Sequence, residues 1–178
     1  ATANNGIDCR ITSFDGMAII ESMGTNQGWI TANDSVKLPV DLPPGVDFTL
    51  KAHIKVQDGD PSGAIGNTRI YLRDQNGNVI TSVNWEDWQS ASGYGNIKLV
   101  CGGGNIYHNG EGGFGTENPE FNGVLEVQRI NNVYYAYLNG NLLNSVNYSE
   151  KNTASYLEIS FGKYSDYTYR DGKIDFIE

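Results

Sequence analysis

The sequence predicts an all-β fold, a sandwich of two antiparallel sheets, on three observations. Apolar and polar residues alternate with a period of two along much of the chain, and the 3.6-residue period of a helix is nearly absent. The candidate strands follow one another at regular spacing and are separated by turn residues. Glycine (22 residues) and tyrosine (11 residues) are abundant, which is typical of short strands joined by tight turns.

The first half of the chain contains three clear segments of this kind. In FTLKAHIKV (48–56) every second residue is apolar. TRIYLRDQNGNVITSVNW (68–85) predicts two strands around Asn76-Gly77, because both residues of such a pair tolerate positive φ in a two-residue turn. GNIKLVCGGGNIYHNG (95–110) continues the alternation and is interrupted by its three consecutive glycines.

The second half contains five more candidate strands. GVLEVQRINNVYYAYLNGNLLNSVNYS (123–149) predicts three strands with turns at Asn131-Asn132 and Asn139-Gly140. SYLEISFG (155–162) and GKIDFIE (172–178) complete the chain. We therefore expect one domain over residues 1–178, in which residues 1–35 form an N-terminal segment that packs on the sandwich.

The composition excludes several classes of partner. The net charge is −9, from 12 basic and 21 acidic residues, and the basic residues form no run. Such a field repels nucleic acid and anionic lipid. No apolar run approaches the ~20 residues that span a bilayer, so we expect no membrane insertion. An acidic surface is compatible with neutral glycans, but it equally serves solubility alone.

The two cysteines, Cys9 and Cys101, match no metal-binding spacing. They could form a disulfide between the N-terminal segment and a middle strand, which would require an oxidising compartment. Two buried thiols are the alternative, and the sequence does not decide between them.

Alternation predicts an exposed polar face on the hairpin of residues 124–140. If the aliphatic residues of this segment point inward, then Glu126 and Gln128 point outward on one strand, and Tyr135 and Tyr137 point outward on the next. Sugars are held by aromatic rings under their C–H faces and by amides and carboxylates at their hydroxyl rims. These four residues are therefore a candidate glycan-binding set.

Two other segments concentrate aromatic residues. NWEDWQSASGYGN (84–96) places Trp85, Trp88 and Tyr94 at the end of a strand and in the following loop, and both tryptophans cannot be core. Trp85 shares the parity of Val79 and Val83 and could instead cap the core. GKYSDYTYRDG (162–172) adds Tyr167 with two neighbouring tyrosines, which either bind a ligand or pack over a sheet edge.

The order FTLKAHIKV, then GVLEVQRINNVYYAYLNGNLL, then YLEISFG, then GKIDFIE resembles the concanavalin A-like lectin and glucanase superfamily, which includes laminin G-like domains. The resemblance covers residues 36–178 and rests on a hairpin that ends in Leu-Asn-Gly, a late strand that ends in Phe-Gly, and a last strand of the I-D-x-I type. It implies a two-sheet antiparallel jelly roll, often with one concave face that holds a glycan. Enzymes, glycan-binding modules and protein-binding modules all share this fold.

The residues argue against catalysis by the known route. Retaining glucanases of the superfamily carry E-x-D-x-x-E on one strand, which sets two carboxylates about 5–5.5 Å apart; this chain lacks the pattern. Only His53 and His108 could act as a histidine base, and no G-x-S-x-G turn is present. A pair such as Glu126 and Glu158 could still meet across strands.

A structural calcium ion is possible at QDGDPSG, where Asp58 and Asp60 flank a glycine. An ordinary Asp-Gly turn is the alternative, and we expect no cofactor to be required. Together these observations predict a non-catalytic carbohydrate-binding module, secreted or at a bacterial cell surface, that recognises a polysaccharide or glycan. A glycoside hydrolase or lyase of the same superfamily and a laminin G-like protein-binding adhesion module are the alternatives.

Overall fold

In the computed structural model, the described part of the chain forms thirteen β-strands and no helix. The described backbone comprises residues 9–14, 17–22, 34–56, 66–86, 96–102, 104–108, 121–163 and 172–177. Side chains are described for residues 37–54, 68–85, 97–102, 104–108 and 121–160.

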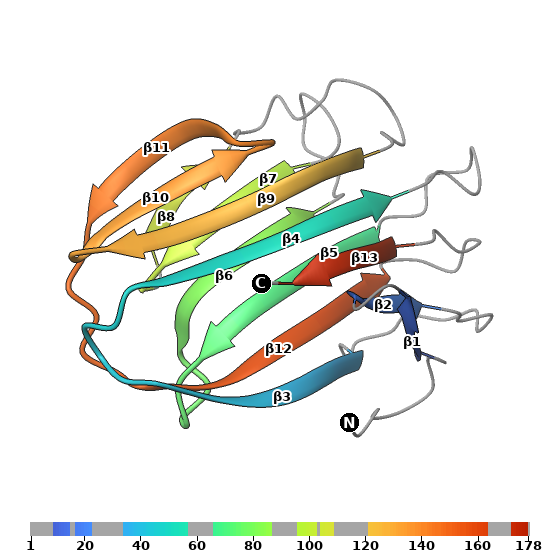
Figure 1. Cartoon of the computed structure of the whole chain (residues 1–178), viewed down its shortest axis with the longest axis horizontal. Helices are drawn as coiled ribbons and strands as arrows, with labels where there is room; N and C mark the ends of the chain where they lie inside the picture. Colours follow the sequence, from blue (N-terminus) through green and yellow to red (C-terminus); the bar gives the residue numbers. More distant parts are fainter. Residues whose placement is uncertain are drawn as a thin grey trace.

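The strands form two antiparallel sheets that pack as layers (Figure 1). In spatial order, the seven-stranded sheet contains β1 (Cys9–Phe14), β2 (Met17–Ser22), β13 (Gly172–Ile177), β4 (Phe48–Val56), β9 (Phe121–Ile130), β10 (Val133–Leu138) and β11 (Asn141–Asn147). In spatial order, the six-stranded sheet contains β3 (Asp34–Leu42), β12 (Ala154–Lys163), β5 (Gly66–Arg73), β6 (Val79–Glu86), β7 (Asn96–Cys101) and β8 (Gly104–His108). The N-terminal segment thus adds the β1–β2 hairpin to the seven-stranded sheet, where β2 pairs with β13.

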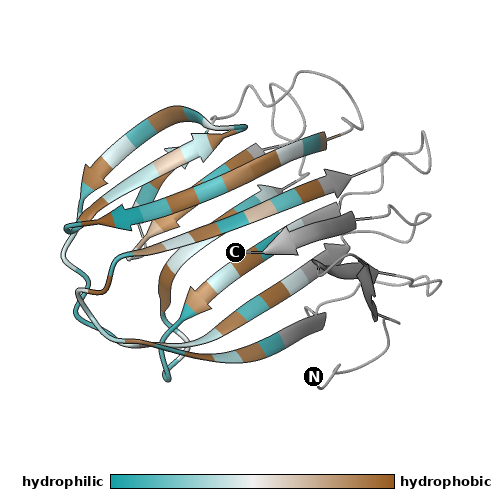
Figure 2. Cartoon of the chain, viewed as in Figure 1, coloured by the Kyte–Doolittle hydropathy of each residue, from teal (hydrophilic) through white to brown (hydrophobic). Residues whose placement is uncertain are grey.

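The core lies between the sheets and consists of alternate residues of each strand. Figure 2 shows this alternation as hydrophobic and hydrophilic bands along the strands. On β9 the burial pattern alternates strictly from Phe121 to Arg129. The fully buried side chains come from both layers: Ile54, Leu125, Val127 and Tyr134 from one sheet, and Ile70, Val83, Trp85, Ile97, Leu99 and Ile159 from the other. Among the described side chains, the apolar residues at alternate positions of these strands are buried, as the alternation in the sequence predicts: Leu50, Ala52, Ile54, Leu125, Val127, Tyr134, Ala136, Leu157 and Ile159.

Two predicted hairpin turns have the expected geometry. Asn131 (φ 51°) and Asn132 (φ 64°) join β9 to β10, and Asn139 (φ 51°) and Gly140 (φ 77°) join β10 to β11. Both positions of each turn have positive φ, as a type I′ turn requires. The Asn131-Asn132 turn sets the register of β9 and β10, on which the candidate site depends.

The β5–β6 turn differs from the prediction. Only Gly77 (φ 86°) has positive φ there, while Asn76 does not. The Gly77 N–H donates to Asp74 O at 3.1 Å and the Asp74 N–H donates to Asn78 O at 3.0 Å. This longer loop ends in a left-handed glycine, a common hairpin connection, and the Asp74 side chain explains why it is preferred here.

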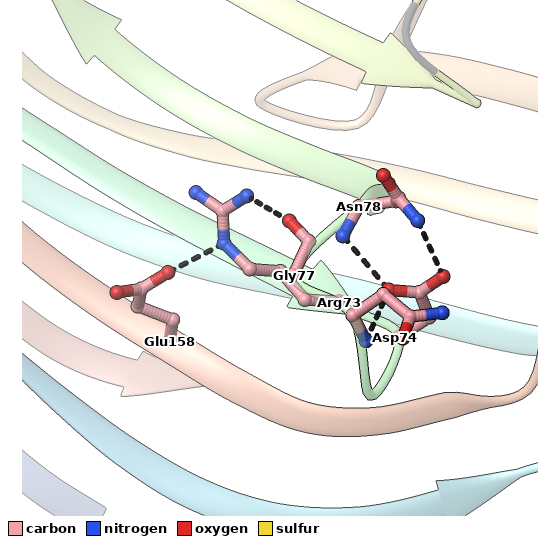
Figure 3. Close-up of polar contacts among 6 residues, drawn as sticks. Arg73, Asp74, Gly77, Asn78 and Glu158 are labelled. Carbon is pink, nitrogen blue, oxygen red and sulfur yellow. Dashed lines mark hydrogen bonds and ion pairs between the residues drawn. The ribbon is translucent and has the colours of Figure 1, made fainter.

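Asp74 organises this turn from a buried position (Figure 3). Its Oδ1 accepts hydrogen bonds from the backbone N–H groups of Asn76 (2.9 Å) and Asn78 (2.8 Å), and its Oδ2 accepts one from Asn78 Nδ2 (2.8 Å). The Asn78 side-chain bond, helped by the backbone N–H groups, holds the pKa of Asp74 below its usual value, although burial acts in the opposite direction.

We expect the wild type to be more stable than Asp74→Asn at neutral pH, and the difference to shrink as pH falls below 3.8, the ordinary pKa of the group. A lowered folded-state pKa contributes stability above the unfolded pKa, and that contribution is lost as pH falls through the folded pKa. Urea unfolding midpoints at several pH values measure it. Asp41→Asn, at an exposed carboxylate of β3, is the control. A difference that does not change with pH would contradict the assignment.

Candidate ligand-binding faces

The tyrosine face, defined as the outer face of the seven-stranded sheet at Glu126, Gln128, Tyr135 and Tyr137, is arranged as predicted. Tyr135 pairs with Gln128 and Tyr137 pairs with Glu126 across the β9–β10 ladder. All four residues are half-buried; Glu126, Gln128 and Tyr135 each lie between two buried neighbours, and Tyr137 lies between the buried Ala136 and the half-buried Leu138. The hairpin therefore presents two rings and two polar groups on one surface, whereas their role in binding stays a prediction.

Within this face the polar groups contact each other and the rings remain open. Gln128 Nε2 donates a hydrogen bond to Glu126 Oε1. Among the described residues, the rings of Tyr135 and Tyr137 stack on no other ring and lie under no cation. An aromatic ring with a free face is what C–H stacking to a sugar needs.

Trp85 belongs to the core and not to a ligand site. Its side chain is completely buried, and its ring stacks on Phe121 with centroids 4.3 Å apart and an interplanar angle of 16°. Of the two alternatives that the sequence left, the structure shows that Trp85 caps the core. The physical reason is its parity on β6, where it follows the buried Val83 on the inward side.

The remaining predicted site residues lie outside the described residues. These are the aromatic candidates Trp88, Tyr94 and Tyr167 and the calcium candidates Asp58 and Asp60. Their roles stay predictions.

The outer face of the six-stranded sheet carries a second set of polar side chains, which the sequence did not assemble. These side chains come from strands that are distant in the sequence, since β12 lies between β3 and β5. The register places them in rows that cross β12, β5, β6 and β7. The rows contain Ser160, Arg69, Asn84 and Lys98, then Glu158, Tyr71, Ser82 and Val100, then Tyr156 and Arg73.

Ionic and cation–π contacts connect this face. Arg73 Nε donates to Glu158 Oε2 at 2.5 Å, as Figure 3 shows, and its guanidinium lies 4.1 Å from the centre of the Tyr71 ring. Lys37 Nζ lies 4.9 Å from the centre of the Tyr156 ring. Both described tyrosines of this face thus have one ring side covered by a cation, unlike those of the tyrosine face. Recognition here would depend on polar and charged groups more than on stacking.

Small polar side chains at the centre of this face are buried although they point away from the core. Ser82, Asn84 and Ser160 are only 1%, 3% and 3% exposed. Asn84 Nδ2 donates to Ser82 Oγ at 3.2 Å. Asn84 Oδ1 and Ser160 Oγ have no hydrogen-bond partner in the described structure. A buried polar atom without a partner costs about 1–3 kcal/mol, so these two oxygens are the clearest indication of a ligand position.

Cys101 is a buried free thiol, so the structure shows the thiol alternative at this position. Burial, with a smaller contribution from the Glu150 carboxylate, raises the pKa of Cys101 to about 11. The thiolate that would act as a nucleophile is therefore disfavoured.

The structure separates the other groups that could act together. His53 lies on β4 of the seven-stranded sheet, and its Nε2 donates to Asn122 Oδ1 at 2.7 Å, whereas His108 ends β8 of the six-stranded sheet. Glu126 and Glu158 likewise lie on different sheets. Among the described residues there is no cluster of three or more His, Cys, Asp or Glu that could hold a metal ion. A search of the same residues for a helix able to cross a membrane finds none.

Comparisons with known proteins agree with the fold. No protein-family model matches the chain, and no curated protein matches its sequence. Among solved structures, the CBM2 module of the Lactobacillus casei BL23 phage J-1 evolved Dit has a TM-score of 0.63 at 13% identity, over 99% of this chain and 89% of that chain. A prokaryotic β-1,3-1,4-glucanase (lichenase) derived from a mouse hindgut metagenome has a TM-score of 0.56 at 7% identity, over 94% and 81%.

A third similar structure is the family 7 alginate lyase A1-II′, with a TM-score of 0.52 at 18% identity, over 98% of this chain and 83% of that chain. At these identities the likeness concerns the fold, not the activity. The chain therefore has the concanavalin A-like jelly-roll fold that its sequence pattern predicted.

Proposed function

We propose that this chain is a non-catalytic carbohydrate-binding module whose glycan lies on the outer face of the six-stranded sheet. The observation on which the proposal rests is the pair of buried oxygens without a partner, Asn84 Oδ1 and Ser160 Oγ. Sugar hydroxyls can donate to both, because each hydroxyl is a donor and an acceptor. Arg69 lies between these two residues in the same row.

The shared fold supports a carbohydrate ligand. The similar structures include a CBM2 module, a glucanase and an alginate lyase. We favour binding over catalysis because the chain lacks the E-x-D-x-x-E pattern and because Glu126 and Glu158 lie on different sheets. Secretion, or display at a bacterial surface, is part of the same proposal.

Ser160→Ala tests the proposal without removing any bond within the described structure. It deletes a buried hydroxyl that has no partner there, so the free energy of unfolding should stay the same or rise. The affinity for the bound polysaccharide should fall roughly tenfold, as expected for one lost buried hydrogen bond. Affinity electrophoresis in gels that contain a panel of neutral and acidic polysaccharides measures the affinity. Ser149→Ala, at an exposed position after β11, is the control.

The same gels separate the alternatives. If Tyr135→Ala and Tyr137→Ala abolish retardation while Ser160→Ala does not, the ligand lies on the tyrosine face and our choice of face is wrong. Release of reducing ends or unsaturated products from a retarding polymer would favour the hydrolase or lyase. An absence of retardation by every polysaccharide would refute carbohydrate binding and leave the protein-binding adhesion module.

A further inference from the structure

The described side chains on the outer face of the six-stranded sheet have a net charge opposite to that of the whole protein. Its described side chains include four cations and one carboxylate, namely Lys37, Arg69, Arg73, Lys98 and Glu158. The chain as a whole has a net charge of −9. A local excess of cations on an acidic protein needs an explanation, because the general acidity already provides solubility.

The one described carboxylate of this face is already engaged. Glu158 accepts from Arg73 Nε at 2.5 Å in an ion pair whose side chains are 20% and 15% exposed. Lys98 forms no ion pair in the described part of the chain. The register pairs Lys98 with Asn84, and Arg69 with both Asn84 and Ser160. Two cations therefore belong to the row that contains both oxygens without a partner.

We infer that the ligand of this face is an anionic polysaccharide, with carboxylate or sulfate groups along its chain. The inference rests on the proposed function and adds the ligand's charge. Ammonium and guanidinium groups only donate hydrogen bonds, and their bonds to anionic oxygens are the strong ones. The hydroxyls of the same sugars satisfy Asn84 Oδ1 and Ser160 Oγ, while the anionic groups contact Lys98 and Arg69. The hydroxyls of a neutral glycan can also accept hydrogen bonds from Lys98, but they lack the attraction between opposite charges that an anionic group adds.

The overall negative charge of the protein does not prevent an anionic polysaccharide from binding to this face at moderate salt. At 0.1 M salt the Debye length is about 10 Å, and packed sheets are also about 10 Å apart. Charges on the far sheet are therefore weakened at this face by salt, whereas direct contacts with Lys98 and Arg69 are not.

The test compares polymers that differ only in charge, at 0.1 M salt, by affinity electrophoresis or calorimetry. Polygalacturonate is compared with its methyl ester, and dextran sulfate with dextran. We expect at least one anionic polymer to bind roughly tenfold more tightly than its neutral counterpart, and Lys98→Gln to weaken that binding roughly fivefold. Lys151→Gln, at an exposed lysine between β11 and β12, makes the same charge change away from the face and should have no effect.

The two anionic arms identify whether carboxylate or sulfate is recognised. Neutral counterparts that bind as tightly as the acidic polymers, through a site sensitive to Ser160→Ala, would overturn the charge inference and leave carbohydrate binding intact. Equal losses in Lys98→Gln and Lys151→Gln would overturn it too, because the attraction would then come from overall charge. Binding to none of the polymers in either set overturns the charge inference, and failure with every polysaccharide in the wider panel removes the proposed function as well.

Discussion

Replacing Trp85 with alanine is expected to lower the free energy of unfolding by about 4 kcal/mol. The side chain is completely buried, and its stacked contact with Phe121 joins β6 of one sheet to β9 of the other. Removing it leaves a large cavity between the layers, which the surrounding strands can fill only in part. The free energy of unfolding of a domain is typically about 5–15 kcal/mol, so this one substitution removes much of the stability.

Denaturant unfolding measures the effect, with Trp85→Phe as the matched control. Phenylalanine keeps an aromatic ring against Phe121 and should cost clearly less than alanine. If Trp85→Ala instead left the unfolding midpoint unchanged and abolished glycan binding, Trp85 would be a ligand residue and its assignment to the core would be wrong.

Gly102→Ala is expected to cost about 3 kcal/mol, from two separate causes. Gly102 has φ +49°, where an L-residue with a side chain is strained by about 1–2 kcal/mol. A Cβ there would also lie 2.0 Å from Cζ of Tyr148, far inside contact distance. The Tyr148 ring packs at 67° against the buried ring of Tyr134, with centroids 6.1 Å apart, so moving it away disturbs this end of the sandwich.

Substitutions at two other glycines distinguish the cost of backbone strain from the cost of the clash with Tyr148. Gly45→Ala adds a Cβ at φ +91° with no atom within 4 Å, so it measures the backbone strain alone. Gly104→Ala adds a Cβ whose nearest neighbour, Cys101 O, is 3.7 Å away and should be nearly neutral. Thermal or urea unfolding should therefore show that Gly102→Ala is clearly less stable than Gly45→Ala. Equal costs at Gly102 and Gly45 would mean that the Tyr148 ring moves aside freely.

The two candidate faces differ in how much of each could be predicted from the local sequence pattern. The tyrosine face could be predicted because Glu126, Gln128, Tyr135 and Tyr137 lie on two strands joined by a two-residue turn, so parity and turn geometry together set the register. The outer face of the six-stranded sheet could not be predicted in this way. It requires β12 to pair with β5, which brings Glu158 to Arg73, 85 residues away in the sequence. The alternation in SYLEISFG predicts that Tyr156, Glu158 and Ser160 point outward, but it does not identify their neighbours on other strands.

The sequence by itself determined the fold class, most strand positions and which face of each strand is apolar, because alternation and turn residues act over a few residues. The tertiary structure decided three further matters. It stacked Trp85 on Phe121 in the core, gathered cations on the outer face of one sheet, and buried Asn84 and Ser160 there without partners. These features depend on the order of strands in a sheet. That order is set by long-range packing between segments whose local patterns are alike.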